Sequence, residues 1–316
     1  MTGNGRYQAR IEPDLQAFID RINALFPPET ASLPLHEQRA VYDRMSAAFH
    51  AGRPPGISVR DETVHGKVHP VRVRRYAHED GNASAAILYF HGGGFVFGGL
   101  DSHDDICAEL CQSTGLETVS VDYRLAPEHP HPAAFDDAVA AMDWTISAIG
   151  RPVVLCGESA GGALAAALAH AGRERPDQPI GQVLIYPPLG GDPTSLSQLE
   201  HAHAPLLTSE DVAFYRRMRA GGGDFANDAT FEPLRDDDFS GLPPTWVVTA
   251  QFDPLASDGA LYAEAIRSAG GRARCVEVPL LVHGFLRARC SVGRARAAFD
   301  QVTEAIAMLA RGAWRD

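Results

Sequence analysis

The stretch VVLCGESAGGALAAALAHAG, residues 153–172, decides how this 316-residue chain folds. An apolar, strand-like run is followed by a run of small, helix-forming residues. Ser159 lies between them, with Gly157 and Gly161 two places to either side. This strand–turn–helix context is that of a nucleophile elbow, whose turn is too tight for larger neighbours of the serine. A serine that only caps the helix also fits, so the motif alone leaves both interpretations open.

Short β-rich runs alternate with helical patterns on both sides of this stretch. The predicted strands are residues 71–77, 85–90, 117–122, 153–156, 180–186, 245–251 and 273–278. The predicted helices between and after them are residues 103–114, 132–149, 160–171, 257–269 and 294–310. Such alternation predicts an α/β fold, with a mostly parallel central sheet flanked by helices on both faces.

Two segments depart from the alternation. Residues 14–26 and 35–49 are helical patterns that precede it, and residues 190–240 are rich in Gly, Pro, Asp and His. One helix is expected in the second segment, at 209–220. We therefore predict a small helical cap over one end of the sheet. The predicted cap is residues 1–55 and 190–240, and the predicted α/β domain is residues 56–189 and 241–316.

Composition restricts the partners and the compartment of this chain. A formal net charge of −12 argues against nucleic acid and anionic lipid as partners. The N-terminus lacks the apolar core of a signal peptide, and no run approaches the ~20 apolar residues of a membrane span. The five cysteines lack CxxC spacing, which indicates reduced thiols in a cytoplasmic protein. Histidine and aspartate clusters at 129–132, 201–203 and 236–238 are interpreted as solvated turns, so no metal is expected.

A nucleophilic serine needs a base, and the sequence offers one well-placed candidate. Lysine is excluded, because Lys67 is the only lysine and no Ser-x-x-Lys pattern exists. His283 is the only histidine after position 203, and it follows the strand at 273–278. In this class of fold the base lies on a loop beyond the carboxyl end of a strand. His283 is therefore the predicted base.

The base in turn needs an orienting acid. Asp253 directly follows the strand at 245–251, whereas Asp258 falls in the next helical turn and is interpreted as a helix N-cap. The chain order Ser159, Asp253, His283 is the order of the α/β-hydrolase arrangement. Asp253 is therefore the predicted acid.

A glycine-rich turn follows the strand at 85–90, in ILYFHGGGFVFGG, residues 87–99. Three bare glycines allow the backbone to approach a substrate, and their amides can donate to a developing oxyanion. One such donor lowers the barrier by about 3–4 kcal/mol. A Gly-Gly-Gly run alone is often only a flexible turn, but the elbow in the same chain favours an oxyanion hole.

These motifs together resemble the hormone-sensitive-lipase-like group of bacterial α/β-hydrolase carboxylesterases. The matching stretches are HGGGF (91–95), DYRLAPEHPHPAAFDDA (122–138), GESAGG (157–162), GLPPTWVVTAQFDPLASDG (241–259) and HGF (283–285). The resemblance runs from about residue 70 to the C-terminus. It departs at Glu158, where members of the group often carry Asp or Thr. We expect Glu158 to alter the hydrogen bonds beneath the acid and the base.

The resemblance implies an α/β-hydrolase fold and a role for each candidate residue. Ser159 would be the nucleophile, His283 the base and Asp253 its acid. The implied oxyanion hole is formed by the amides of Gly93, Gly94 and Ala160. Phe95 and Tyr186 are interpreted as walls of the substrate pocket, although aromatic residues beside strands are more often core.

We expect a serine carboxylesterase that hydrolyses short-to-medium acyl esters through an acyl-enzyme, without a cofactor. The expected partner is a small-molecule ester, and the resemblance allows a homodimer that nothing in the sequence requires. Two alternatives stay open. One is an amidase or dedicated deacylase with the same triad. The other is a non-catalytic small-molecule receptor on this fold, against which the intact His283 argues.

Overall fold

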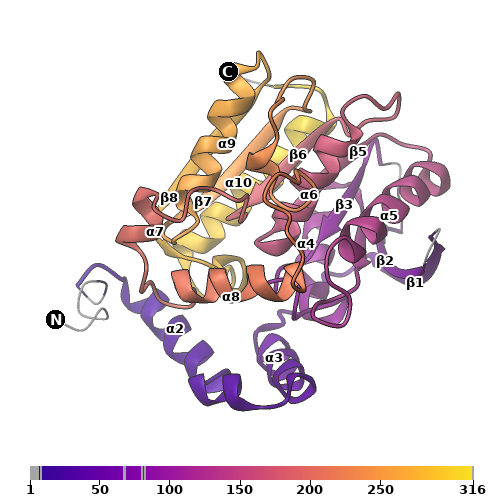
Figure 1. Ribbon diagram of the computed structural model, residues 1–316. Coiled ribbons are helices and arrows are strands. Elements are labelled where there is room, and N and C mark those ends of the chain that lie inside the picture. The colour runs from indigo at the N-terminus through magenta and orange to yellow at the C-terminus, as the bar shows by residue number, and fades with distance from the viewer. Residues whose placement is uncertain (1–6, 8, 67–68, 80, 82, 315–316) are drawn as a thin grey trace.

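The computed structural model describes residues 7, 9–66, 69–79, 81 and 83–314 (Figure 1). Within these residues one eight-stranded sheet has the order β1-β2-β4-β3-β5-β6-β7-β8. Its strands are β1 (Ile57–His65), β2 (Pro70–His78), β3 (Ala86–Phe90), β4 (Glu117–Asp122), β5 (Val153–Glu158), β6 (Gly181–Ile185), β7 (Thr245–Phe252) and β8 (Ala273–Val282). All neighbours from β4 to β8 pair in parallel, while β2 pairs antiparallel with both β1 and β4.

Helices cover both faces of this sheet, as the alternation predicts. They are α4 (Asp104–Thr114), α5 (Ala133–Ile149), α6 (Ala160–Gly172), α9 (Ala256–Ser268) and α10 (Gly293–Ala310). Successive strand residues point to opposite faces. In β3, Ile87 belongs to a core with α4 and α10, and Leu88 to a second core with α5, α6 and α9. The predicted α/β-hydrolase fold is confirmed.

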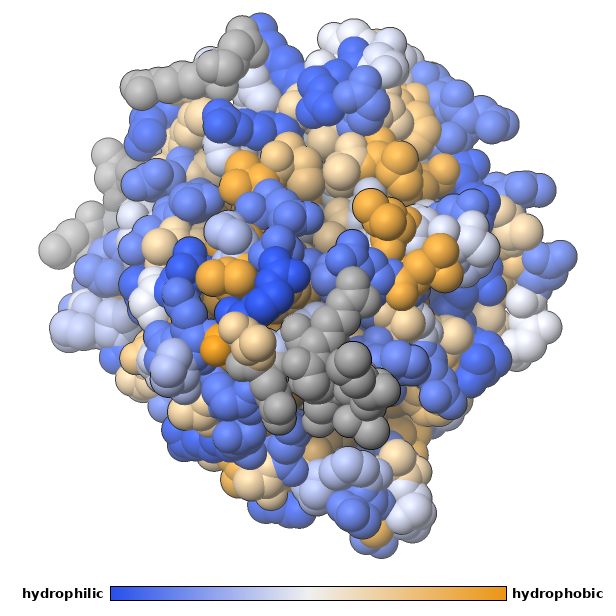
Figure 2. All heavy atoms as spheres, turned by 90° about the vertical axis from the view of Figure 1, so that its left-hand side faces the viewer, coloured by the Kyte–Doolittle hydropathy of each residue, from blue (hydrophilic) through white to orange (hydrophobic). Residues whose placement is uncertain are grey.

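Figure 2 shows one face, on which small apolar spots are scattered among polar residues. The large apolar side chains that are exposed are Leu196, Leu199, Phe214 and Leu261. None of the helices in the described part of the chain is both long and apolar enough to cross a membrane.

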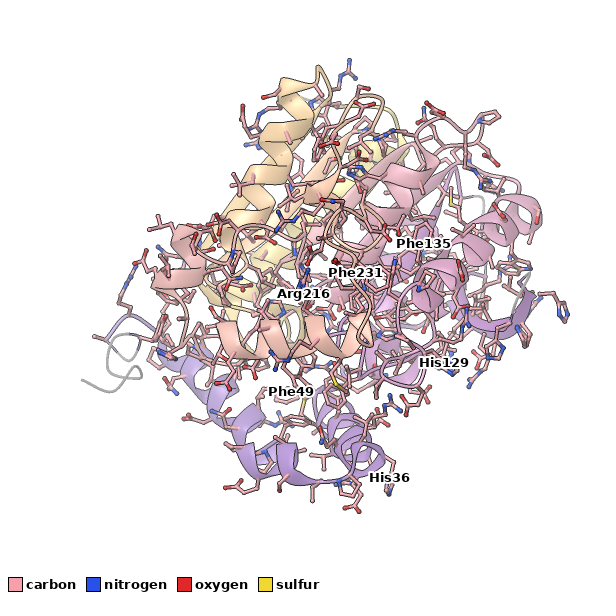
Figure 3. All side chains as sticks on the ribbon, viewed as in Figure 1. His36, Phe49, His129, Phe135, Arg216 and Phe231 are labelled. Atoms are coloured by element: carbon pink, nitrogen blue, oxygen red, sulfur yellow. The ribbon has the colours of Figure 1, made fainter. Side chains whose placement is uncertain are left out.

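Among the residues that the structure describes, four α-helices come from the two segments predicted to form the cap. They are α2 (Pro13–Leu25), α3 (Leu35–Phe49), α7 (Leu196–Glu200) and α8 (Ser209–Ala220). Figure 1 shows α2, α3 and α8 gathered at one end of the sheet. Phe18 of α2 and Phe49 of α3 pack edge to face, with ring centroids 5.2 Å apart (Phe49 is labelled in Figure 3). The division into a cap and a catalytic domain stays a prediction, and residues 1–6 and 8 of the proposed cap lie outside the described residues.

A capping box fixes the start of α8. The Thr208 hydroxyl accepts a hydrogen bond from the Asp211 amide at 3.1 Å, and the Asp211 carboxylate accepts one from the Thr208 amide at 2.9 Å. These two bonds satisfy donors that a helix start otherwise leaves unpaired. The expected helix at 209–220 therefore begins and ends where the sequence pattern places it.

Candidate active site

Ser159 lies on a sharp turn between β5 and α6, with φ 51° and ψ −123°. A Cβ atom on Gly157 would lie 2.2 Å from the carbonyl oxygen of Gly161, and one on Gly161 would lie 2.0 Å from that of Phe90. Real Cβ atoms do not approach backbone this closely, so both positions require glycine. The serine side chain makes no capping bond with α6. The helix-capping interpretation of Ser159 is therefore not what the structure shows.

Three side chains from the ends of three strands form a hydrogen-bonded chain at this edge of the sheet. The Ser159 hydroxyl lies 2.9 Å from Nε2 of His283, and Nδ1 of His283 lies 2.7 Å from Oδ2 of Asp253. Asp253 is fully buried, and its other oxygen accepts a bond from the Leu255 amide at 2.9 Å. The two bonds fix the tautomer of His283, with the proton on Nδ1 and a free base at Nε2 facing the serine.

Asp258 plays a different structural part from the predicted helix N-cap. The N-cap position of α9 is Leu255, and no side chain caps that helix. Oδ2 of Asp258 instead accepts the backbone amides of Leu189 and Gly191, at 2.8 and 3.2 Å. Burial raises the pKa of this carboxyl to about 6. Asp258 lies in the first turn of α9, so these two bonds tie that helix to the loop after β6.

The glycine-rich turn presents unpaired amides to the same edge. Gly93 and Gly94 have φ of 119° and 64°, a region that side chains rarely adopt. Among the described residues, no protein acceptor takes the amides of Gly93, Gly94 or Ala160. A Cβ on Gly94 would meet the ring of Tyr215 at 2.3 Å, so helix α8 lies directly on this loop. The three amides predicted for an oxyanion hole are therefore free to donate to a ligand.

The carboxylate of Glu158 ties this turn to the elbow. Its Oε1 lies 2.5 Å from Nε2 of His103 and accepts the Gly92 amide at 3.3 Å, while Oε2 accepts the Tyr186 hydroxyl. Burial raises the pKa of Glu158, but His103 and the Tyr186 hydrogen bond outweigh it and bring the pKa down to about 2. Glu158 thus acts beneath the base through Tyr186, whose ring lies against that of His283, while its other oxygen binds the glycine turn.

His91 braces the glycine turn from within. Its Nδ1 lies 2.7 Å from the Gly92 carbonyl oxygen, which requires the proton on Nδ1. Its ring stacks on that of Tyr123, with centroids 4.2 Å apart. Burial, with His103 nearby, lowers the pKa of His91 to about 3. The ring is therefore neutral across the physiological range.

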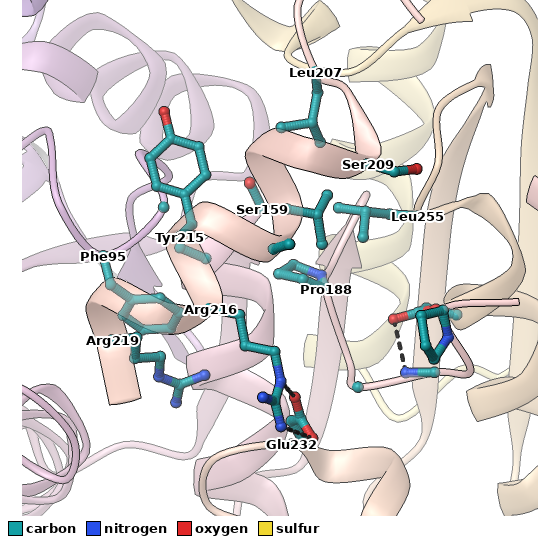
Figure 4. Close-up of a pocket in the computed structure, with 18 of the residues that line it drawn as sticks. Phe95, Ser159, Pro188, Leu207, Ser209, Tyr215, Arg216, Arg219, Glu232 and Leu255 are labelled. Carbon is teal, nitrogen blue, oxygen red and sulfur yellow. Dashed lines mark hydrogen bonds and ion pairs between the residues drawn. The ribbon is translucent and has the colours of Figure 1, made fainter. Parts of the chain in front are cut away.

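Two cavities meet at Ser159. The larger, of about 370 Å³, is closed by α8 and by the loops after β6 and β7 (Figure 4). The smaller, of about 170 Å³, runs toward the N-terminal helices and is lined by residues such as Phe18 and Tyr42. His283 lines the smaller cavity and not the larger one. The nucleophile candidate is thus reached from two sides.

Of the two residues predicted to line the substrate pocket, only one does so. Phe95 lines the larger cavity and is 5% exposed. Tyr186 is completely buried and lines neither cavity. Its ring lies against that of His283, with centroids 4.6 Å apart, and its hydroxyl is used by Glu158. Tyr186, which directly follows β6, therefore supports the base and does not form a pocket wall.

Most of the remaining pocket wall comes from the segment 190–240, in which the sequence analysis named no pocket residue. The wall residues from α8 are Ser209, Val212, Ala213, Tyr215, Arg216 and Arg219. The spacing of three and four residues places most of them on one helix face. That periodicity is the signal that could have identified them. Among the described residues no group of His, Cys, Asp and Glu side chains is arranged to hold a metal ion.

Comparison with known proteins places this chain among esterases. A family model described as alpha/beta hydrolase fold matches residues 87–287. Esterase LipI of Mycobacterium tuberculosis is 38% identical over 244 residues, which are 73% of this chain and 76% of LipI. Ethyl acetate hydrolase of Pseudomonas putida is 32% identical over 313 residues, covering 94% of this chain and 98% of that protein.

Solved structures agree over nearly the whole chain. The hyperthermophilic esterase from the archaeon Pyrobaculum calidifontis superimposes with a TM-score of 0.88 at 34% identity, covering 95% of this chain and 99% of that one. An ester hydrolase from the Lake Arreo metagenome, solved with a bipyridine phosphonate derivative, superimposes with a TM-score of 0.87 at 31% identity. It covers 94% of this chain and 98% of that one.

Proposed function

Because this chain belongs to the α/β-hydrolase family, in its hormone-sensitive-lipase-like group of bacterial carboxylic ester hydrolases, we propose that it cleaves esters with Ser159, His283 and Asp253. The observation that carries the proposal is the unbroken chain of hydrogen bonds, 2.9 Å from Ser159 to His283 and 2.7 Å from His283 to Asp253. As the chain is an ester hydrolase, the non-catalytic receptor considered from the sequence is set aside.

The first half of the reaction forms an acyl-enzyme. His283 takes the proton of Ser159 through Nε2 as the hydroxyl oxygen attacks the ester carbonyl. The imidazolium that forms is stabilised by the buried carboxylate of Asp253. His283 then gives the proton to the departing alkoxide, so the alcohol leaves neutral. In the second half, water repeats these steps on the acyl group and frees Ser159.

The oxyanion of each tetrahedral intermediate would be held by the amides of Gly93, Gly94 and Ala160. These donors are fixed before substrate binds, since the positive φ of both glycines and the start of α6 determine their direction. Preorganised donors cost no rearrangement during the reaction, and each lowers the barrier by about 3–4 kcal/mol. The first turn of α6 also directs its partial positive charge at this point.

The size of the larger cavity supports short-to-medium acyl chains. Its volume is about 370 Å³, and its wall includes side chains of α8 together with Phe231, Glu232 and Arg235. The name of the Pseudomonas relative, ethyl acetate hydrolase, refers to a short acyl group. We therefore propose that activity falls once the acyl chain exceeds this cavity.

A series of p-nitrophenyl esters from acetate to palmitate tests the proposal, with wild type beside Ser159→Ala. We expect activity that peaks at short chains and disappears in Ser159→Ala, whose fold is kept because alanine fits the turn as well as serine. Ser58→Ala, an exposed serine on the edge strand β1, is the matched control and should retain full activity. Mass spectrometry of quenched reactions should show an acyl adduct in wild type only. Turnover retained by Ser159→Ala would overturn the mechanism.

A further inference from the structure

The larger cavity changes from apolar to charged along its length (Figure 4). Leu207, Pro188 and Leu255 surround the part beside Ser159. The ion pair of Arg216 and Glu232, which Figure 4 draws with dashed lines, lies at the opposite end. An acyl chain that enters this cavity therefore meets a hydrocarbon wall first and charged groups last.

Guanidinium groups outnumber carboxylates in the cavity wall. The wall contains Arg216, Arg219 and Arg235 against Glu232 and Asp258. Glu232 is shared between two of the arginines, since Arg216 binds both of its oxygens and Nε of Arg235 lies 3.6 Å away. One carboxylate thus neutralises only one of two positive charges. In a protein of net charge −12 this excess is a local feature rather than a general one.

Arg216 keeps donors that the protein does not use. Its Nε and Nη2 face Glu232, and its Nη1 has no acceptor among the described residues. The side chain is half exposed, and its guanidinium carbon lies 5.5 Å from the ring centroid of Phe231, beside which Figure 3 labels it. A guanidinium held along one edge by a carboxylate can bind a second carboxylate along another edge.

Arg219 adds a positive charge that lacks a carboxylate partner among the described residues. It is 6% exposed, and its guanidinium lies 3.9 Å from the ring centroid of Phe95 and 4.6 Å from that of Phe231. Two of its nitrogens donate to the carbonyls of Phe231 and Thr230, and its buried Nε has no acceptor. Burial lowers its pKa to about 9. An anion near this end of the cavity would supply the counter-charge.

The position of the base shows which part of an ester would reach these groups. The leaving alcohol has to lie beside Nε2 of His283, because it takes its proton from there. His283 lines only the smaller cavity of the two. The alcohol therefore occupies the smaller cavity, and the acyl group of the ester attached to Ser159 extends into the larger one.

We propose that this enzyme prefers esters whose acyl chain ends in a carboxylate, such as monoesters of dicarboxylic acids, with Arg216 as the residue that binds this group. The inference rests on the proposed function, since it assumes acyl transfer at Ser159. Arg219 and Arg235 contribute the surrounding positive potential, which attracts an anionic substrate and disfavours a cationic one. The apolar wall beside Ser159 accommodates the methylene groups between the two ends.

A pair of substrates that differ only in charge tests this. Monoethyl adipate ends in a carboxylate, and the ethyl ester of adipic acid monoamide has the same length and shape without the charge. Ethanol release is followed at about pH 8, where the carboxylate is ionised. We expect kcat/KM to be at least about fivefold higher for the carboxylate ester. In Arg216→Gln this ratio should fall to about one, because the charge-assisted hydrogen bond that distinguishes the two substrates is lost.

Arg217→Gln is the matched control, because it removes the same charge from an exposed position of α8 that does not line the cavity. It should leave the ratio unchanged, and Arg216→Lys should restore part of it. Equal ratios in Arg216→Gln and Arg217→Gln, or a wild type that prefers the amide, would overturn the inference. Hydrolysis of ethyl butyrate, an uncharged ester, distinguishes failure of the charge preference from failure of the proposed function. If it is cleaved in a Ser159-dependent way, only the charge preference is refuted, whereas inactivity on every ester refutes the proposed function as well.

Discussion

Nε2 of His103 and Oε1 of Glu158 lie 2.5 Å apart, buried directly beneath the turn that carries Ser159. On the far side of the imidazole, Nδ1 of His103 lies 2.8 Å from the Ser102 hydroxyl. Glu158 also accepts the amide of Gly92. Because the Ser102 hydroxyl also accepts the Gly99 amide at 2.9 Å, one buried polar network joins the elbow to both ends of the glycine-rich loop. The nucleophile and the oxyanion donors are positioned relative to each other through a single carboxylate.

Removing the charge of Glu158 should reduce turnover. Glu158→Gln keeps the size of the side chain but has only one oxygen for the donors that the carboxylate serves, so the glycine turn loses part of its anchor. We expect kcat to fall about tenfold with little change in KM, since the loss affects transition-state geometry more than binding. Glu117→Gln, which disrupts an ion pair with Arg75 away from the site, is the control. Equal kcat for wild type and Glu158→Gln would contradict this role.

The same carboxylate should make stability depend on pH. The pKa of Glu158 is about 2 in the folded protein, against 4.5 for an ordinary glutamate. The folded state therefore binds fewer protons, and the stabilisation is complete above pH 4.5 and is lost as the pH falls toward 2. The difference in free energy of unfolding between wild type and Glu158→Gln should shrink by roughly 2–3 kcal/mol over that window. Urea titrations at several pH values measure it, and a constant difference would exclude the proposed ionisation.

Two aspartates five positions apart should respond very differently to the same substitution. Asp253→Asn presents an amide to Nδ1 of His283 and favours the wrong tautomer, so kcat should fall about 10³- to 10⁴-fold. Asp258→Asn can still accept the Leu189 and Gly191 amides, and we expect a loss below about tenfold. Hydrolysis of p-nitrophenyl butyrate gives both values. Similar losses in the two variants would mean that the acid has been assigned to the wrong residue.

The sequence predicted those features that depend on neighbouring residues. The strands of the parallel sheet, the helices on its faces and the turn around Ser159 follow from local apolar periodicity and from glycine spacing. Strand β1 (Ile57–His65) was not predicted, because it is an antiparallel edge strand whose side chains are mostly exposed and carry no clear apolar pattern. The short helix α7 (Leu196–Glu200) was missed for a similar reason, as it exposes both of its leucines.

The parts of the site that were not predicted depend on contacts between distant segments. The partners of Glu158 are His103, 55 positions away, and Tyr186, 28 positions away. Asp258 binds a loop 69 positions earlier in the chain. Tyr186 has the aromatic ring expected of a pocket wall, but it is completely buried and packs against His283. No pattern within a single segment predicts such pairings. The triad could be predicted because Ser159, Asp253 and His283 each follow a predicted strand.

Gly161 should tolerate no side chain, for a steric reason and not a catalytic one. A Cβ there would lie 2.0 Å from the carbonyl oxygen of Phe90, so Gly161→Ala forces α6 away from β3 at the point where the elbow packs on the sheet. We expect a loss of roughly 3 kcal/mol or more in the free energy of unfolding, or insoluble protein. Gly172, at the other end of α6, is the internal control. Its Cβ would make only ordinary contacts at 3.7 Å and beyond, so Gly172→Ala should be neutral or slightly stabilising. Thermal unfolding of Gly161→Ala and Gly172→Ala compares the two ends of α6. Equal stability of the two variants would show that the elbow accommodates a Cβ atom without loss of stability.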